Sequence, residues 1–160
     1  MNSTRASMRL RYQDQDSKLT LREGLAEYYA SNKDLIDPSA TSTPEMGLYF
    51  ASHDASHVAF GTSTDIEDEL LNDVWTFFAV DVKYRYYVSE LTTTKEEALK
   101  VVKGIPFWGT IRGIGLLAWR LPALIWRSRT MTKKWPWRGW EAYLDRPLDE
   151  IRRELGLKVF

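Results

Sequence analysis

Hydrophobic residues recur along most of this chain at the spacing of an α-helix. Apolar positions three or four residues apart fill residues 20–36, and Asp37-Pro38 closes that segment. Pro44 suits the first turn of a second helix, because the N–H that proline lacks has no partner there. We expect that helix to end near Phe60, where Gly61 suits its C-terminal cap.

Four further helical segments are predicted. The first runs from about residue 65 towards residue 87 and opens with a Thr64–Glu67 capping box, although residues 80–88 are also compatible with a strand. The others are residues 94–104, an apolar stretch over residues 106–129 broken by Pro122, and residues 148–155, which Gly156 follows.

We therefore predict an all-α fold, a compact helical bundle with a long, apolar and basic C-terminal helical region. Residues 1–18 should form a flexible N-terminus, and residues 19–160 a single helical domain.

Composition narrows the function classes. The chain has 160 residues, 44% of them hydrophobic, with 22 basic and 22 acidic side chains, so its net charge is zero. A neutral chain is not, as a whole, a nucleic-acid binder. The absence of cysteine excludes disulfides, thiolate metal sites and a cysteine nucleophile.

The balanced charge is divided along the chain. Residues 41–80 contain seven acidic residues and no Lys or Arg, whereas residues 101–140 contain eight basic residues and no Asp or Glu. One interpretation is that the acidic block holds a cation and the basic block meets anionic headgroups or a phosphate. The other is that the two blocks neutralise each other across the fold.

The chain has only two histidines, His53 and His57, four residues apart in the second predicted helix. This spacing stacks both rings on one helix face. Together with Asp54 they offer three ligands that zinc or another divalent ion accepts. The alternative is a pair of core histidines hydrogen-bonded to Asp54 and to backbone.

A further ligand would come from the start of the next helix. Five acidic residues lie there, and periodicity does not choose among them: Asp65, Glu67, Asp68, Glu69 and Asp73. These acids could equally be favoured by the helix dipole alone. If a metal is bound, Asp73 is a candidate for orienting an imidazole N–H from outside the ligand set.

These residues resemble a known metal motif. His53-Asp54-Ala55-Ser56-His57, followed by eleven residues and Glu69, resembles the H-D-x-x-H-x(11)-E motif of the ubiquinone (coenzyme Q) biosynthesis protein 4 family. Gly61, Gly109-Thr110-Ile111-Arg112, and the closing segments Trp140-Glu141 and 147–156 are also similar to that family, so the resemblance covers residues 19–160.

The resemblance implies that His53, Asp54, His57 and Glu69 bind a divalent ion, with zinc the leading choice and iron, cobalt or manganese also compatible. It further implies a peripheral membrane protein of ubiquinone biosynthesis, which removes the C1 carboxyl of a polyprenyl-hydroxybenzoate oxidatively. The ion would then act as a Lewis acid, through which these four ligands carry the catalysis. The expected place is the inner face of a bacterial inner membrane, or the matrix side of the mitochondrial inner membrane.

Residues 105–126 are long enough to cross a bilayer, but Arg112 and Arg120 within them would each cost about 2.5–3.5 kcal/mol at its centre. We therefore expect a helix in the headgroup plane or lining a tunnel for an isoprenoid tail, with Trp108, Arg112, Trp119 and Arg120 binding lipid or its headgroup. A buried core helix with a basic rim is the alternative.

Three functions remain at this point. The first is the metal-dependent enzyme (a lyase), and the second is a non-catalytic isoprenoid-binding scaffold for other quinone biosynthesis proteins. The third is a metal hydrolase unrelated to quinones, because the histidine spacing is similar to that of zincins, which carry Glu where this chain has Asp54. The predicted partners are a polyprenyl quinone precursor or another isoprenoid lipid, a membrane surface and other quinone biosynthesis proteins, and a homodimer is also compatible.

Overall fold

The computed structural model describes residues 9–82 and 107–160, and this part of the chain is all-α. Its α-helices are α1 (Leu21–Ser31), α2 (Pro44–Phe60), α3 (Ile66–Ala79), α6 (Phe107–Thr130) and α7 (Leu148–Leu155). There are also three short 3-10 helices: η1 (Arg11–Gln13) precedes α1, η2 (Pro38–Ala40) lies between α1 and α2, and η3 (Trp140–Tyr143) lies between α6 and α7. Extended pairing within the described residues is limited to two isolated bridges, Thr20 with Pro147 and Val80 with Trp135.

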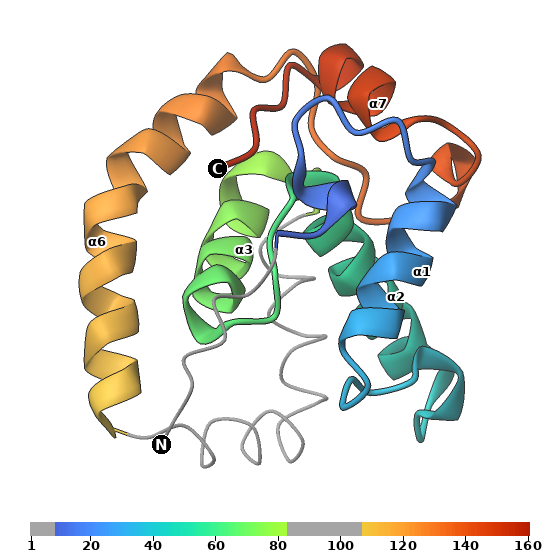
Figure 1. Ribbon diagram of the computed structural model, residues 1–160, viewed down its shortest axis with the longest axis horizontal. Helices are drawn as coiled ribbons and strands as arrows, with labels where there is room; N and C mark the ends of the chain where they lie inside the picture. The colour runs from blue at the N-terminus through green and yellow to red at the C-terminus, as the bar shows by residue number, and fades with distance from the viewer. Residues whose placement is uncertain (1–8, 83–106) are drawn as a thin grey trace.

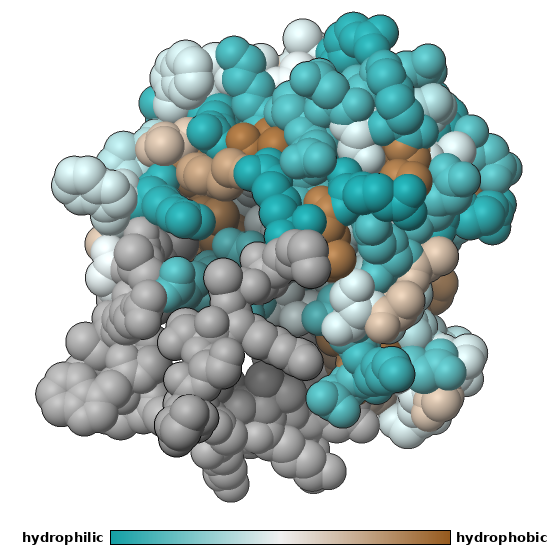
Figure 2. Space-filling model, in the orientation of Figure 1, coloured by the Kyte–Doolittle hydropathy of each residue, from teal (hydrophilic) through white to brown (hydrophobic). Residues whose placement is uncertain are grey.

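The helices surround a core rich in aromatic side chains. Helix α6 runs along one side of the molecule and packs against α3, while α1 and α2 lie on the other side of α3 (Figure 1). Trp75, Trp135 and Trp137 are almost wholly buried in this core. On the face shown in Figure 2, polar residues cover most of the described surface, and apolar atoms show only in patches between them.

Two helices have the bounds that the sequence predicts. Helix α2 begins with Pro44 in its first turn and is capped by Gly61, whose φ of 75° is left-handed. Helix α7 ends the same way at Gly156, with a φ of 65°. At both ends, proline or glycine fixes a backbone conformation that other residues adopt less readily.

Three other segments differ from their predictions. Helix α1 ends at Ser31 rather than at residue 36, because Asn32 leaves the helical conformation and its side-chain amide donates to the Tyr28 carbonyl at 2.7 Å. Helix α3 ends at Ala79, and Val80 pairs with Trp135 instead. The predicted Thr64–Glu67 capping box is wrong, since Asp65 is the N-cap and makes no side-chain capping bond.

Pro122 does not break the long basic helix. Helix α6 continues through it from Phe107 to Thr130. Pro122 is exposed, and an exposed position leaves room for the local bend that accommodates the ring. The predicted helix over residues 94–104 lies outside the described residues.

The expected flexible N-terminus is wrong for residues 9–18, which belong to the fold. The Tyr12 side chain is fully buried, and its hydroxyl donates to the Thr62 carbonyl at 2.8 Å. Backbone bonds from Leu148 and Asp149 to carbonyls of residues 17 and 19 tie this segment to α7.

A buried arginine joins the N-terminal segment to α2. The Arg152 side chain is 0% exposed, and its guanidinium donates to four backbone carbonyls, those of Tyr12, Asp14, Val58 and Ala59. Val58 and Ala59 lie in the last turn of α2, where helix carbonyls have no intrahelical partner. Arg152 therefore holds the end of α2 that carries His57.

Among the described residues, no helix combines the length and apolar character needed to span a bilayer. The acidic and basic blocks meet where α6 packs against α3. Arg120 of α6 lies 3.8 Å from Asp68 of α3.

Candidate metal centre

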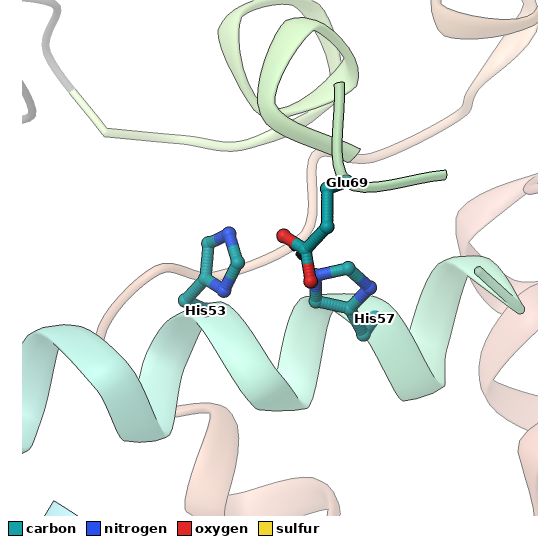
Figure 3. Close-up of side chains that lie close together, drawn as sticks. All are labelled: His53, His57 and Glu69. Atoms are coloured by element: carbon teal, nitrogen blue, oxygen red, sulfur yellow. Dashed lines mark ion pairs between the residues drawn. The ribbon is translucent and has the colours of Figure 1, made fainter. Parts of the chain in front are cut away.

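The two histidines lie on one face of α2, as their spacing predicts. The centroids of the His53 and His57 rings are 4.7 Å apart, and both rings point toward α3 (Figure 3). The His57 side chain is completely buried, and that of His53 is 13% exposed. The face of α2 that the sequence marks as a ligand face is therefore covered by α3.

Glu69 approaches from the first turn of α3. The turn after Gly61 returns the chain directly alongside the last turn of α2, and Asp68 ties that turn by accepting from the Ser63 N–H at 2.8 Å. With Asp68 committed to the loop, Glu69 points at the histidines (Figure 3). One ligand atom each from His53, His57 and Glu69 lie within 4.8 Å of one another, and this group could hold a metal ion.

The closest pair in this group is spaced for a shared ion. His57 Nε2 lies 3.4 Å from Glu69 Oε2. Two ligands of a tetrahedral zinc ion with bonds of about 2.0–2.1 Å are roughly 3.4 Å apart. His57 Nε2 is also buried without a hydrogen-bond partner among the described residues. A nitrogen and a carboxylate oxygen in this arrangement fit a cation between them.

Asp54, the remaining predicted ligand, lies beside this group of three but is not a member of it. Its Oδ1 is 4.0 Å from His53 Nδ1, and its Oδ2 accepts a hydrogen bond from the Tyr29 hydroxyl at 2.9 Å. Burial raises the pKa of the Asp54 carboxyl, while His53 and the Tyr29 hydrogen bond act in the opposite direction.

Asp73 lies next to the outer nitrogen of His53. Its Oδ1 is 3.2 Å from His53 Nε2, the place that an acceptor orienting this ring must occupy. Burial lowers the pKa of His53, but the hydrogen bond to Asp73 and the charges of Asp73, Glu69 and Asp54 outweigh it and raise that pKa to about 9. Burial likewise raises the pKa of Glu69, and the two imidazoles outweigh it, so that pKa is lowered.

The centre is closed on the α2 side and open on the α3 side. The side-chain exposure rises from 0% at His57 to 30% at Glu69 and 46% at Asp73. The described side chains therefore do not enclose the group completely. Catalytic zinc sites are open to solvent at one position, whereas structural sites are closed.

Several residues of this site do not stand out in the sequence. Tyr28 of α1 stacks on the His57 ring at a centroid distance of 5.5 Å, and its buried hydroxyl has no hydrogen-bond partner among the described residues. The Thr62 hydroxyl lies 2.9 Å from His57 Nδ1. Thr62 directly follows the glycine that caps α2, and that position is the one sequence signal that could have found it.

The predicted lipid-binding residues are on α6. The side chains of Trp108 and Arg112 lie outside the described part of the chain. Trp119 is 84% exposed. The Arg120 guanidinium faces the protein, near Asp68 and over the Phe160 ring at 5.8 Å.

Comparisons with protein-family models, with curated proteins and with solved structures found no match to this chain.

Proposed function

We propose that this protein is a metal-dependent enzyme whose ion is held by His53, His57 and Glu69. The proposal rests mainly on one observation. His57 Nε2 is buried without a hydrogen-bond partner among the described residues, and it lies 3.4 Å from Glu69 Oε2. A hydrogen-bonded histidine pair, the alternative from sequence, explains the contact of His53 with Asp73 and requires hydrogen on His57 Nε2, facing Glu69 at 3.4 Å.

Zinc is the ion that we expect first. Two imidazoles and one carboxylate, with an open position, are a common ligand set of catalytic zinc. Iron, cobalt and manganese accept the same donors. Asp54 is the fourth ligand in the motif that this chain resembles, and its Oδ1 remains available because Tyr29 engages only Oδ2.

The proposed substrate is a polyprenyl-hydroxybenzoate, and the proposed reaction is oxidative removal of its C1 carboxyl in ubiquinone biosynthesis. The carboxyl leaves as carbon dioxide, a hydroxyl takes its place on C1, and a two-electron oxidant supplied from outside the protein accepts the electrons, because zinc is not redox-active. The support is the His53-Asp54-x-x-His57-x(11)-Glu69 spacing, which resembles the ubiquinone biosynthesis protein 4 family. A bound divalent ion supplies Lewis acidity toward an oxygen of the substrate. In this arrangement Asp73 orients His53, and α2 excludes water from the His57 side of the site.

Membrane contact and isoprenoid binding belong to the same proposal. Trp119 and Trp126 are exposed on α6, at 84% and 58%, and are separated by seven residues, which places them on one helix face. Arg129 is exposed at the end of the same helix. Exposed Trp beside cationic residues is typical of helices at a membrane surface.

The second candidate function is a non-catalytic scaffold that presents an isoprenoid quinone precursor to other biosynthesis proteins. The exposed tryptophans of α6 favour it as much as they favour the enzyme, because they bear on lipid contact and not on chemistry. In that case the ion would be structural.

Metal content tests the site. The protein is loaded with zinc, desalted and measured for bound metal by inductively coupled plasma mass spectrometry. Wild type should hold about one zinc per chain, and His57→Ala and Glu69→Gln should hold little. Glu45→Gln is the matched control, an exposed glutamate in the first turn of α2, and should bind like wild type. Equal metal in all four proteins would remove the ligand assignment.

Substrate turnover then separates enzyme from scaffold. A polyprenyl-hydroxybenzoate with a ¹³C-labelled carboxyl is supplied in vesicles, and labelled carbon dioxide is measured in parallel with complementation of a quinone-deficient strain. The enzyme predicts release by wild type and loss of both readouts in Glu69→Gln. The scaffold predicts lipid binding without release and full complementation by Glu69→Gln.

A further inference from the structure

Beneath the two histidines lies a chain of buried polar side chains. Ser56, His57 and Asn72 are 0% exposed, and Thr62 is 2% exposed. Ser56 belongs to α2, Asn72 to α3, and Thr62 to the turn that joins these helices. A buried polar group of this kind is stable only when each donor meets an acceptor.

The directions of the hydrogen bonds made by Ser56 and Asn72 follow from their donors and acceptors. The Ser56 hydroxyl has one proton, and it donates it to the His53 carbonyl at 2.6 Å. Ser56 Oγ must therefore accept from Asn72, whose Nδ2 lies 3.0 Å away. This fixes the Asn72 amide with its Oδ1, which can only accept, toward Thr62.

The Thr62 hydroxyl has one proton and two neighbours that can accept it, Asn72 Oδ1 at 3.4 Å and His57 Nδ1 at 2.9 Å. When it donates to Asn72, it offers a lone pair toward His57, and His57 Nδ1 then carries the hydrogen. A neutral imidazole with hydrogen on Nδ1 has its lone pair on Nε2, the atom that faces Glu69.

This tautomer matters because the other one would need no metal. With hydrogen on Nε2, His57 would hydrogen-bond directly to Glu69, and the two groups would satisfy each other. With hydrogen on Nδ1, the buried Nε2 and the carboxylate face each other as two acceptors. In the tautomer with hydrogen on Nδ1, the site without a cation is penalised, and the polar chain prepares it for one.

We propose that Thr62, held by Asn72, is a positioning residue that sets His57 in its metal-binding tautomer. This inference rests on the proposed metal site and adds to it the group that selects the ligand nitrogen. Gly61 makes the placement possible, because its left-handed turn brings the Thr62 N–H within 3.0 Å of the His57 carbonyl and the hydroxyl beside the ring.

The tautomer is measured directly by ¹⁵N NMR of the histidine rings in metal-free protein at pH 8. Wild type should show His57 hydrogenated on Nδ1, and Thr62→Val should shift it to Nε2, where Glu69 accepts. Thr62→Ser keeps the hydroxyl and should retain the wild-type signal. An Nε2-hydrogenated or doubly protonated His57 in wild type would overturn the inference without any variant.

Zinc affinity is the second readout, measured by competition with a chromophoric chelator. Loss of a group that orients a ligand typically weakens metal binding about 10–100-fold, and we expect this for Thr62→Val and Thr62→Ala. Thr62→Ser should stay within about threefold, since its hydroxyl preserves the hydrogen bond that orients the ligand. The second, smaller variant keeps the test available if valine prevents folding.

Thr76→Val is the matched control. Thr76 is equally buried in α3, and its hydroxyl bonds to the Asn72 carbonyl, not to a histidine. It should leave the tautomer and the zinc affinity unchanged. Equal zinc affinity and the same tautomer in wild type and Thr62→Val would refute the role of Thr62 while leaving the metal site intact. Absence of zinc binding in wild type would instead refute the proposed function, and the metal-free NMR signal would still decide the tautomer.

Discussion

At the scale of single residues, the candidate metal centre contains more negative than positive charge. Three carboxylates, Asp54, Glu69 and Asp73, surround two imidazoles. A buried excess of negative charge is costly unless a cation offsets it. A metal ion is one such cation, and in metal-free protein a proton on His53 is the other, which is why the pKa of His53 is raised to about 9.

This raised pKa predicts how the stability of the metal-free protein depends on pH. The native state binds the His53 proton more tightly than the unfolded state, whose pKa is near 6.5. The stabilisation is therefore complete below pH 6.5 and is lost as pH rises through about 9. Urea unfolding in chelator, repeated across that range, should show a falling free energy of unfolding.

His53→Gln isolates this effect, because glutamine keeps a hydrogen-bonding side chain that does not titrate. The difference in stability between wild type and the variant should shrink as pH rises. Saturating zinc should also reduce the slope, since the ion replaces the proton. A constant difference from pH 6.5 to 9 would show that the three carboxylates do not act on His53 as described.

A second prediction at this scale concerns Arg152. Replacing it by methionine removes the buried donor of four backbone carbonyls, of which that of Asp14 still accepts from the Ser17 N–H. Each buried acceptor left without a partner costs about 1–3 kcal/mol, so we expect a loss of about 3 kcal/mol or more in chemical denaturation. Zinc affinity should fall as well, because two of those carbonyls end the helix that carries His57.

Arg153→Met is the control for this change. Arg153 is the next residue, its side chain is 71% exposed, and it pairs with Asp149, a buried carboxylate that Lys18 also binds. Because Asp149 keeps Lys18 as its partner, we expect loss of the exposed Arg153 charge to cost about 0–1 kcal/mol. If both variants lost the same stability, the buried contacts of Arg152 would not explain its effect.

At the scale of secondary structure elements, the end of α2 determines the geometry of the site. Gly61 has a φ of 75°, and a Cβ there would lie 3.0 Å from Val159 Cγ1 and 3.2 Å from the Gln13 carbonyl oxygen. Gly61→Ala should therefore cost more than the roughly 1–2 kcal/mol of a left-handed alanine. Because Thr62 follows directly, zinc affinity should fall with stability.

Gly139→Ala separates the conformational cost of a left-handed alanine from the steric cost of an added Cβ. Gly139 has a φ of 78° but nothing within 4 Å of an added Cβ, so only the conformational cost applies. We expect it to lose about 1–2 kcal/mol and to bind zinc normally. Thermal unfolding and chelator competition on both variants provide the comparison, and equal losses would exclude a steric role for Gly61.

How far the sequence predicts each element depends on local signals. Pro44, Gly61 and Gly156 act on their own backbone, and the bounds of α2 and α7 are confirmed. The end of α1 was missed because apolar spacing continues to Ile36, while Asn32 interrupts the helix through its side chain. Residues 9–18 were missed because their partners, such as Arg152, are distant in sequence.

In the candidate metal centre, too, local signals in the sequence predict some features, and contacts between distant residues determine the others. Helical spacing alone places His53 and His57 on one face, and a short turn places α3 beside them. Periodicity did not select Glu69 among its acidic neighbours, and the family resemblance did. The polar chain from Ser56 to Thr62 could not be predicted, because its direction depends on how Asn72 of α3 meets α2 in three dimensions.

At the scale of the whole molecule, only part of the basic block (residues 101–140) pairs with the acidic block (residues 41–80). Arg120 of the basic block pairs with Asp68 of the acidic block, at 3.8 Å. Other residues of α6 face solvent, among them Trp119, Trp126 and Arg129. The inner side of α6 thus serves the fold, and its outer side is available for contact with another surface.

The proposed contact with a membrane makes a prediction for this outer side. Trp119→Ala and Trp126→Ala should each weaken binding to vesicles of phosphatidylcholine and phosphatidylglycerol about tenfold. Partial burial of a Trp side chain of about 150–250 Å² is worth roughly 1.4 kcal/mol or more. Leu48→Ala removes a side chain that is 48% exposed on α2, and it should bind like wild type.

Binding should also weaken as salt rises, since Arg129 would meet the anionic headgroups. If all three variants sediment with vesicles as wild type does, the outer face of α6 is not the membrane surface, and the proposal must place lipid elsewhere on the protein.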